Sequence, residues 1–355
     1  MVDRSLERMI EGWDGLAVVS RHHRPTNAWI FIALHDDALG GPTGGTRIKV
    51  YDTPSDGLRD ALRLAEGMTH KWAAIDLPFG GGKGVLALDH EPSPTEREAL
   101  LVCYGRLVET LRGSFSTGQD LGTTTEDMLF LARHTRFVHG PDRDTGRALD
   151  PGPYTARGVF AGLRAAVEHL FGSPDLKDRR ILVQGAGGVG RPLADRCARG
   201  GAELLLSDLD EQRVGSVAEE LVAQVVSPQD VYSTPCDVYA PCAVGATLNP
   251  ATISRLRCRI VAGAANNQLG ASGDAELLHE RRILYAPDYV INGGGALAFG
   301  LKAQGEKSEE RIGERLDGLG ATLTEIFAEA REREESPLHA ARRRVERVLA
   351  RARES

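Results

Sequence analysis

One stretch limits the fold of this chain more than any other. Residues 181–190 read ILVQGAGGVG, an apolar run that passes directly into Gly185-x-Gly187-x-x-Gly190. Such a run is typical of a buried strand, and residues 191–199 after the glycines have helical character. A second apolar run, residues 203–206, leads to Asp208, about twenty residues beyond the glycines. This order predicts a βαβ unit that binds a dinucleotide.

The same pattern gives each residue type a part in cofactor binding. Glycines let the backbone approach a pyrophosphate, and the N-terminus of the following helix stabilises its charge. Asp208 can accept hydrogen bonds from the adenosine ribose and repels a 2′-phosphate, so we expect NAD rather than NADP. The predicted cofactor contacts in this stretch are Gly185, Ala186, Gly187, Gly188, Val189, Gly190, Arg191 and Asp208.

Three further apolar runs follow this unit and predict additional strands. They cover residues 238–243, 259–264 and 283–286, and their alternation with helical sequence predicts a parallel, doubly wound α/β sheet. Polar loops lie near the ends of these runs, with the sequences PCAVGATLN, GAANNQL and PDYVINGGG. Ligands of such sheets bind beyond the carboxyl ends of the strands. We therefore interpret Asn266 and Asn267 as ligand contacts rather than as ordinary turn residues.

A second glycine-rich stretch, residues 67–84, reads GMTHKWAAIDLPFGGGKG and contains Lys71 and Lys83. Only six of the 43 basic residues are lysines, so a lysine is expected mainly where arginine cannot replace it. Arginine stays charged, whereas a buried lysine can lose its proton and act as a base. The alternative is a surface turn with two solvated lysines. Lysine scarcity and the apolar flank at residues 75–79 favour a functional site.

Several motifs resemble the Glu/Leu/Phe/Val (amino-acid) dehydrogenase superfamily. They are GGTR at residues 44–47, GMT-x-K at 67–71 and LPFGGGKG at 77–84. Asp120, by itself a turn or N-cap aspartate, is followed two residues later by Gly-Thr, as in that family. The resemblance extends over residues 44–295 and is closest to the leucine, valine and phenylalanine dehydrogenases. It implies an N-terminal α/β substrate domain, a Rossmann-type doubly wound NAD-binding domain, and a cleft between them.

The resemblance also implies a reaction, the reversible NAD-dependent oxidative deamination of an L-amino acid to a 2-oxo acid and ammonia. By resemblance, Lys71 binds the α-carboxylate, Lys83 is the catalytic base, and Asp120 transfers protons at the amine and at the attacking water. Asn267 is a further carboxylate contact, while Asn266 and Thr155 hold the nicotinamide amide. The remaining implied contacts are Thr43, Gly44, Met68, Ala296, Leu297 and Phe299 for the substrate, and Cys242, Ala243 and Ala265 for the cofactor.

Three positions depart from the family pattern. Trp72 and Gln119 stand where relatives commonly have asparagine and glutamate, and Asp76 replaces a small residue. A carboxylate close to Lys83 would stabilise the protonated lysine and impair the base. The competing hypothesis is therefore a non-catalytic relative that binds an amino acid and NAD. The joint presence of Lys71, Lys83 and Asp120 argues against it.

Thr43 bears on the substrate. Glutamate dehydrogenases carry a lysine directly before the GG-x-R segment, where it pairs with the side-chain carboxylate of the substrate. This chain has Thr43 there, and a buried carboxylate without a partner is costly, so the substrate side chain is expected to be neutral. A leucine-like or valine-like substrate is favoured, with phenylalanine or tryptophan as the alternative.

Composition narrows the other classes of partner. The 355 residues suffice for two domains, predicted at residues 1–137 (substrate and oligomerisation) and 138–330 (NAD), with a C-terminal helix at 331–355. A net charge of -7 suggests no nucleic-acid or membrane partner, and no apolar run approaches the ~20 residues that span a bilayer. Five cysteines without a CxxC pair indicate neither disulfides nor a metal site. We expect a cytoplasmic homo-oligomer.

The expected elements are as follows. In the first domain, strands are predicted at residues 28–35, 47–51 and 84–89, with the paired glycines before Arg47 as a turn. A helix from Ser55 runs to Lys71, and another covers residues 95–112. In the second part, helices are predicted at 158–170, 308–335 and 337–353, the last as an arginine-rich solvated helix, after a linker at 139–157.

Overall fold

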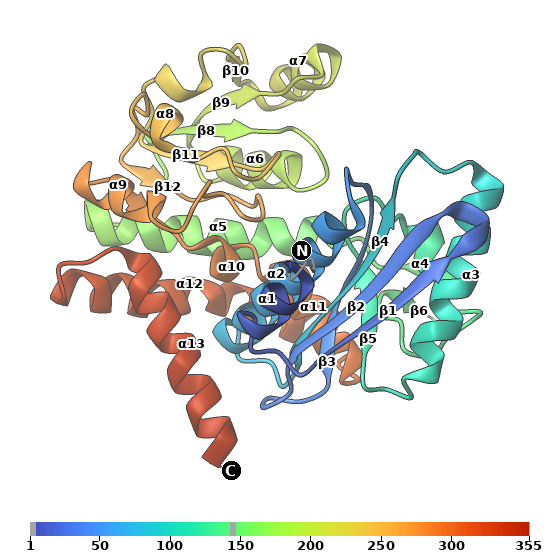
Figure 1. Cartoon of the computed structure of the whole chain (residues 1–355). Helices are drawn as coiled ribbons and strands as arrows, with labels where there is room; N and C mark the ends of the chain where they lie inside the picture. Colours follow the sequence, from blue (N-terminus) through green and yellow to red (C-terminus); the bar gives the residue numbers. More distant parts are fainter. Residues whose placement is uncertain (1–4, 143–146, 355) are drawn as a thin grey trace. The chain divides into compact units, whose positions relative to one another are not determined.

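A computed structural model describes residues 5–142 and 147–354 (Figure 1). The chain divides into two compact units, Met1–Asp150 with Arg347–Ser355, and Pro151–Glu346. Within the described residues, none of the helices combines the length and the apolar character needed to cross a bilayer.

A five-stranded mixed sheet forms the centre of the first unit. Its order is β1-β2-β4-β3-β5, with β3 parallel to both β4 and β5, and β2 antiparallel to β1 and β4. The strands are β1 (Ala17–His23), β2 (Ala28–Asp36), β3 (Pro42–Val50), β4 (Gly80–Leu88) and β5 (Ser116–Gln119). The helices are α1 (Ser5–Glu11), α2 (Pro54–Ala74), α3 (Pro94–Thr110) and α4 (Thr125–Leu131).

Alternating side chains of β2 fill a core on each face of this sheet. Ile30 and Ile32 pack with Tyr104 of α3 in one cluster, whereas Phe31 packs with Leu62 of α2 in the other. The period of two places successive residues on opposite faces, so the strand is apolar throughout because both faces are covered. The sheet is thus the middle layer between α2 on one side and α3 and α4 on the other (Figure 1).

Two predictions about glycines in this unit were wrong. Gly44 and Gly45 lie inside β3 rather than in a turn, and β4 begins at Gly80, so Lys83 lies within the strand. A Cβ on Gly44 would lie 1.7 Å from the carbonyl oxygen of Gly82 on the neighbouring strand. The glycines are needed because the two strands and their neighbours approach too closely for side chains. The edge strand β1 has no counterpart among the predicted strands.

The second unit contains a six-stranded, fully parallel sheet of order β10-β9-β8-β11-β12-β13. The chain moves outward from β8 to β10 and then returns to β11 and continues the other way. This is the predicted doubly wound topology. The strands are β8 (Arg180–Gln184), β9 (Glu203–Ser207), β10 (Gln224–Val225), β11 (Val238–Pro241), β12 (Ile260–Val261) and β13 (Leu284–Tyr285).

Helices flank the sheet of the second unit, and α5 and α12 pack along each other (Figure 1). The helices from residue 152 onward are α5 (Gly152–Phe171), α6 (Gly190–Arg199), α7 (Glu211–Leu221), α8 (Pro250–Ile253), α9 (Asp274–Glu280), α10 (Asp288–Ile291), α11 (Gly294–Ala303), α12 (Glu309–Glu332) and α13 (Pro337–Glu354), and the end of α13 from Arg347 belongs to the first unit. The short strands β6 (Pro141–Asp142) and β7 (Arg147–Ala148) pair before α5.

The structure corrects three predictions in the C-terminal half. The PDYVINGGG segment forms α10 and the start of α11 rather than a loop. Helix α5 begins at Gly152, so the end of the predicted linker is helical, and residues 143–146 of that linker lie outside the described residues. Helix α13 is not simply a solvated helix, because Leu338, Ala341 and Val345 are buried along one of its faces.

Candidate active site

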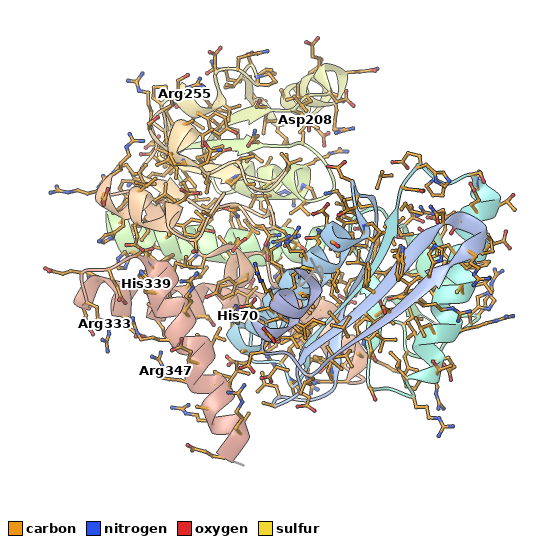
Figure 2. All side chains as sticks on the ribbon, in the orientation of Figure 1. His70, Asp208, Arg255, Arg333, His339 and Arg347 are labelled. Carbon is orange, nitrogen blue, oxygen red and sulfur yellow. The ribbon has the colours of Figure 1, made fainter. Side chains whose placement is uncertain are left out.

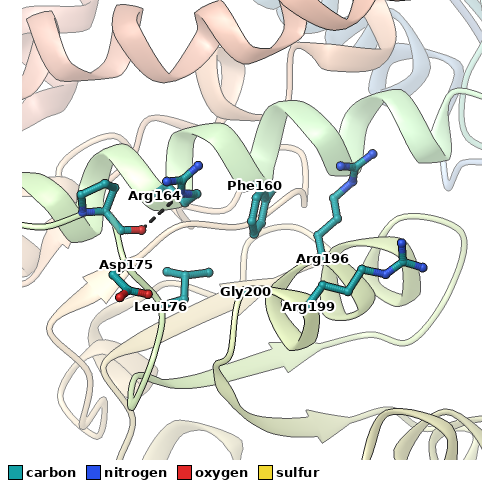
Figure 3. Close-up of a pocket in the computed structure, with 8 residues that line it drawn as sticks. Phe160, Arg164, Asp175, Leu176, Arg196, Arg199 and Gly200 are labelled. Carbon is teal, nitrogen blue, oxygen red and sulfur yellow. Dashed lines mark hydrogen bonds between the residues drawn. The ribbon is translucent and has the colours of Figure 1, made fainter.

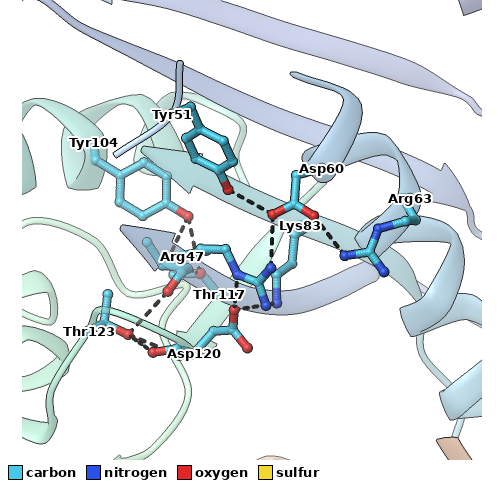
Figure 4. Close-up of polar contacts among 10 residues, drawn as sticks. Arg47, Tyr51, Asp60, Arg63, Lys83, Tyr104, Thr117, Asp120 and Thr123 are labelled. Carbon is cyan, nitrogen blue, oxygen red and sulfur yellow. Dashed lines mark hydrogen bonds and ion pairs between the residues drawn. The ribbon is translucent and has the colours of Figure 1, made fainter. Parts of the chain in front are cut away.

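Lys83 lies in the middle of β4, between β2 and β3. Its side chain is only 4% exposed, and its ammonium nitrogen lies 3.1 Å from Oδ2 of Asp120 (Figure 4). The alternative of a solvated lysine in a surface turn is therefore wrong for this residue.

Neighbouring glycines make room for polar side chains next to β4. A Cβ on Gly45 would lie 3.2 Å from Nζ of Lys83 and 2.7 Å from Cβ of Asp120. A Cβ on Gly84 would lie 2.1 Å from the hydroxyl of Tyr104. Each of these glycines is required because another polar side chain fills the place of its own.

Asp120 follows the last residue of β5, and its backbone is fixed by Thr123. The amide of Asp120 donates to Oγ1 of Thr123 at 2.9 Å, and the amide of Thr123 donates to the Asp120 carbonyl at 3.1 Å. The N-cap of α4 is Thr124, which forms a capping box with Asp127. The N-cap interpretation of Asp120 is thus wrong, and its carboxylate is directed to Lys83 and Arg47.

Arg47 and Asp60 complete a buried charge network that the sequence prediction missed (Figure 4). Nε of Arg47 lies 2.9 Å from Oδ2 of Asp120, and Nη1 lies 2.8 Å from Oδ2 of Asp60. Tyr51 donates to the same Asp60 oxygen at 2.7 Å, and Arg63 binds Oδ1 at 2.7 Å. The signal available in the sequence was the arginine of the GGTR motif.

Burial and charge act in opposite directions on the two central groups. Burial lowers the pKa of the Lys83 ammonium, Asp120 raises it, Arg47 lowers it again, and the net shift is downward. Burial alone would raise the pKa of the Asp120 carboxyl, but Lys83 and Arg47 outweigh it and hold that pKa below its ordinary value. A buried lysine with a lowered pKa beside a carboxylate is an arrangement that can supply a general base.

The end of α2 brings more of the predicted substrate residues to the same sheet. Lys71 is in the last turn of α2, as predicted, and is half-buried. A Cβ on Gly44 would lie 3.2 Å from Cγ of Met68, one helical turn before Lys71. The carbonyl of Thr43 accepts a hydrogen bond from Nε1 of Trp72 at 2.8 Å. Trp72, which departs from the family pattern, is buried and ties α2 to β3.

Asp76, the second departure, terminates α2. It takes a left-handed φ of +54°. Its amide donates to the carbonyl of Ala73, and the amide of Leu77 donates to that of Trp72. This pair of bonds is a Schellman motif, whose left-handed position is usually glycine or asparagine. Asp76 is exposed, and the carboxylate that pairs with Lys83 is Asp120. The departure of Asp76 from the family pattern therefore affects the capping of α2 and not the pairing of Lys83.

The glycine fingerprint of the second unit has the geometry of a dinucleotide site. Gly185 has φ of +98°, and a Cβ on Gly190 would lie 1.7 Å from the carbonyl oxygen of Gly185. A Cβ on Gly187 or Gly188 would meet nothing within 4 Å in the described part of the chain. Gly185 thus allows the tight turn, and Gly190 allows α6 to pack closely on the end of β8. Gly187 and Gly188 leave backbone accessible to a pyrophosphate. These residues fit a nicotinamide dinucleotide.

Asp208 directly follows Ser207, the last residue of β9 (Figure 2). Its Oδ2 accepts a hydrogen bond from the amide of Ala186 at 2.6 Å, and Oδ1 accepts from the amide of Asp210 at 2.9 Å. Burial would raise the pKa of the Asp208 carboxyl, but these amides and Arg213 lower it. The carboxylate is thus ionised and fixed against the glycine loop.

The remaining predicted residues lie in loops and helix starts of the second unit. Oδ1 of Asn266 accepts from Nδ2 of Asn292 at 2.8 Å, and Asn267 has a left-handed φ of +50°. A Cβ on Gly295 would lie 2.7 Å from Oγ1 of Thr155, which places the start of α5 beside that of α11. Cys242 and Ala243 follow β11, and the amide of Ala265 donates to the carbonyl of Pro241. On α11, Ala296 and Phe299 are half-buried and Leu297 is buried.

The second unit also contains a pocket that lies apart from these clusters. A pocket of about 330 Å³ lies at the C-terminal end of α6, the opposite end from the glycine fingerprint (Figure 3). It is lined by Phe160, Arg164, Pro174, Asp175, Leu176, Arg196, Arg199 and Gly200. In the described part of the chain, no group of three or more His, Cys, Asp or Glu side chains is placed to hold a metal ion.

Comparison with known proteins shows which family has this arrangement. Residues 19–137 match the model for the Glu/Leu/Phe/Val dehydrogenase dimerisation domain, and residues 203–354 match that for Glutamate/Leucine/Phenylalanine/Valine dehydrogenase. Leucine dehydrogenase of Bacillus cereus is 38% identical over 90% of this chain and 86% of its own length. Phenylalanine dehydrogenase of Lysinibacillus sphaericus is 40% identical over 84% and 79%.

A solved structure agrees with these sequence relationships. The crystal structure of L-tryptophan dehydrogenase from Nostoc punctiforme superposes with a TM-score of 0.84 at 36% identity, covering 98% of this chain and 100% of that one. With the buried lysine–aspartate pair, the doubly wound sheet and its glycine fingerprint, these similarities show that the chain belongs to the Glu/Leu/Phe/Val dehydrogenase family of amino-acid dehydrogenases.

Proposed function

We propose that this protein catalyses the NAD-dependent oxidative deamination of a neutral L-amino acid to the 2-oxo acid and ammonia, and the reverse reaction. The observation that carries the proposal is the ion pair between buried Lys83, in the glycine-rich strand β4, and Asp120, which follows β5, with 3.1 Å between Nζ and Oδ2. Burying such a pair costs desolvation energy, so an enclosed lysine with a lowered pKa favours a catalytic role over a purely structural one.

Three residues of the first unit, Lys71, Lys83 and Asp120, have separate roles in this chemistry. Lys71 binds the α-carboxylate, and Lys83 in its neutral form accepts a proton as water adds to the imine. Asp120 accepts a proton from the substrate amine and returns it to the nitrogen of the carbinolamine, so that the C–N bond breaks with release of ammonia. Both contacts described for its carboxylate within residues 5–142 and 147–354 end at Oδ2, which leaves Oδ1 for the substrate. NAD, when bound, supplies the hydride acceptor for Cα.

The second unit holds the cofactor in this proposal. Gly187 and Gly188 leave space for the pyrophosphate at the start of α6, and Asp208 binds the adenosine ribose. The fixed negative charge of Asp208 supports NAD over NADP. Thr155 and Asn266 bind the nicotinamide amide, and Cys242, Ala243 and Ala265 line the site.

The substrate is proposed to have a neutral side chain because Thr43 carries no charge. Its hydroxyl donates to the carbonyl of Gly41 at 3.0 Å and its own carbonyl binds Trp72, so the segment offers no cation to a carboxylate. Met68 and Gly44 provide an apolar surface nearby. We favour a leucine-like or valine-like substrate. A phenylalanine or tryptophan substrate is the second candidate, favoured by relatives with those names at 39–40% identity.

One assay tests these statements together. The protein is mixed with NAD and each of Leu, Val, Phe, Trp and Glu, and NADH absorbance is followed to obtain specificity constants, with NADP in a parallel series. Turnover of a neutral amino acid with NAD is expected. A clear preference for glutamate would refute the Thr43 argument. Binding of an amino acid and NAD without turnover would instead support the non-catalytic alternative.

We also propose that the chain forms a homo-oligomer, because the family model that matches residues 19–137 describes a dimerisation domain. Light scattering on the purified protein measures the mass directly, and a mass of 38.3 kDa, that of one chain, would contradict this proposal.

A further inference from the structure

Arg47 occupies an unusual position, because it connects two partly buried carboxylates that come from different elements. Its side chain is 12% exposed, and those of Asp60 and Asp120 are 13% and 17% exposed. Asp60 comes from α2 and Asp120 from the end of β5, while Arg47 is on β3 between them. Partly buried charges are retained only where each has a partner. The Arg47 guanidinium meets this condition on both sides.

Asp60 is itself fixed by three donors. Tyr51 and Arg47 both bind Oδ2, at 2.7 and 2.8 Å, and Arg63 binds Oδ1 at 2.7 Å (Figure 4). Donors on both oxygens therefore hold the carboxylate in its orientation toward Arg47. Tyr51, Asp60 and Arg63 make no hydrogen bond or ion pair with Lys83 in the described residues. Asp60 therefore acts on Lys83 through Arg47 and, at longer range, through its own negative charge.

We propose that Arg47 and Asp60 are positioning residues for the reaction: Arg47 holds the Asp120 carboxylate beside Lys83, and Asp60 holds Arg47. This inference rests on the proposed function of Lys83 and Asp120. It assigns to the arginine of the GGTR motif a role in keeping Lys83 available as a neutral base.

The physical reason is a competition for the charge of Asp120. An ionised Asp120 that faced Lys83 alone would stabilise the ammonium and keep the lysine protonated. Arg47 binds the same oxygen, Oδ2, and so offsets that attraction while its own charge opposes protonation of Lys83. Among the elements packed against β4, the other ionisable groups are His35 and Asp36 on β2, Lys49 on β3, and Asp56, Arg59, Asp60, Arg63, Glu66, His70 and Lys71 on α2. Of these, Asp60 acts on the charge of Lys83.

The two residues therefore have effects of opposite sign on Lys83. Removing the positive charge in Arg47→Gln leaves Asp120 paired with Lys83 alone, so protonation of Lys83 becomes easier. Removing the negative charge in Asp60→Asn takes away a carboxylate that favours protonation and leaves Arg47 paired with Asp120 alone. Protonation of Lys83 then becomes harder. If the two residues had a purely structural role, both variants would lose activity, but the pKa of Lys83 would not shift in opposite directions.

The scarcity of lysine makes a direct measurement possible. Labelling with [ε-¹³C]lysine gives six signals, because the chain contains only Lys49, Lys71, Lys83, Lys177, Lys302 and Lys307. The signal of Lys83 is identified by its loss in Lys83→Met, and its chemical shift is followed against pH in the apo protein. We expect the midpoint to rise by about one pH unit in Arg47→Gln and to fall by about half a unit in Asp60→Asn. The low-pH limb of kcat/KM is expected to move in the same directions.

Asp56→Asn is the matched control, because Asp56 is also on α2 and also pairs with an arginine three residues later, but is 40% exposed. It is expected to leave the midpoint unchanged. Arg47→Lys keeps the charge and should restore most of the original midpoint. If Arg47→Gln does not fold, the shift of the Lys83 titration midpoint in Asp60→Asn alone tests the inference.

Midpoints that move in the same direction in the two folded variants, or do not move, would overturn the inference. Because the NMR titration needs no turnover, this result is separate from that of the activity assay. An inactive chain with the expected shifts would contradict the proposed function but not the positioning of Asp120. An active chain without the shifts would contradict only the positioning.

Discussion

At the scale of single residues, the proposed site depends on a property that lysine has and arginine lacks, the ability to lose its proton. The chain has 43 basic residues, and almost all are arginines, yet the most buried cation of the site is Lys83. Its neighbour Arg47 is an arginine in the same network. The two residue types thus have different roles, because arginine provides a permanent charge that holds carboxylates in two directions, whereas lysine can release a proton.

Replacement of Lys83 tests this difference between the roles of lysine and arginine. Lys83→Ala is expected to lose ~10²–10⁴-fold in kcat, the usual scale for a general base. Lys83→Arg should be no better, because the guanidinium does not deprotonate. Steady-state rates with the preferred amino acid measure both. Lys302→Arg, a surface lysine paired with Glu309, is the control and should keep full activity. An active Lys83→Arg variant would show that the base is another group.

Asp208 sets the expected choice of cofactor. Asp208→Ser removes both the ribose acceptor and the repulsion of a 2′-phosphate, and it frees Arg213, whose Nη1 lies 3.5 Å from the carboxylate. We expect KM for NAD to rise about tenfold or more and the preference over NADP to narrow. Specificity constants for both cofactors measure this, with Asp210→Ser as the neighbouring control. Equal use of NAD and NADP by the unchanged protein would refute the role of Asp208.

At the scale of secondary structure, the end of α2 places Lys71 and Trp72 and so contributes to the site. Asp76 holds the left-handed position of that helix end at a conformational cost, because its Cβ is close to the backbone there. Asp76→Gly is expected to stabilise the first unit by up to about 1 kcal/mol, whereas Asp76→Val should destabilise it by about 1–2 kcal/mol. Urea unfolding measures both changes. The kcat/KM of Asp76→Gly should equal that of the unchanged chain, and a change would mean that Asp76 acts on Lys83 after all.

Elements with local signals could be predicted from the sequence. The βαβ fingerprint is contiguous, and its strand, glycines, helix and Asp208 were found in the predicted order. Helix α3 was predicted at residues 95–112, and in the structure Ser93 and Glu96 form a capping box at its start. Such signals act over a few residues, so the sequence alone contains them.

Elements that depend on distant partners were predicted poorly. Gly44 and Gly45 suggested a turn, but the reason for glycine at position 44 is the backbone of Gly82, on the neighbouring strand. The glycines of α11 suggested a loop, but a Cβ on Gly294 would lie 2.4 Å from the carbonyl oxygen of Tyr154 on α5. The Arg47 network joins residues 13 and 73 positions apart, and only the register of the sheet brings them together.

At the scale of the whole molecule, the two units can be followed separately because all three tryptophans, Trp13, Trp29 and Trp72, lie in the first unit. Tryptophan fluorescence therefore reports the unfolding of that unit alone, while far-ultraviolet circular dichroism reports both. This matters because a protein with two units need not unfold in one step.

The buried charge network makes the first unit sensitive to acid. Burial alone would raise the pKa of Asp60, but Tyr51, Arg63 and Arg47 lower it to about 2. An unfolded aspartate titrates near pH ~3.9, so between these values the unfolded chain binds more protons. The resulting stability, about 2 kcal/mol, is fully present above pH ~4 and is lost as the pH falls toward 2. Asp120 and Asp127, whose pKa values are also lowered, add losses of the same sign.

Asp60→Asn tests this origin of the acid sensitivity. The variant has no carboxyl to protonate, so its unfolding free energy, measured by urea titration of tryptophan fluorescence, should fall less steeply between pH 4 and 2 than that of the unchanged chain. At pH 7 it should be less stable, because Arg47 and Tyr51 lose their charged partner. The two curves are therefore expected to converge in acid. Curves for Asp60→Asn and the unchanged chain that stay parallel would show that another group causes the loss.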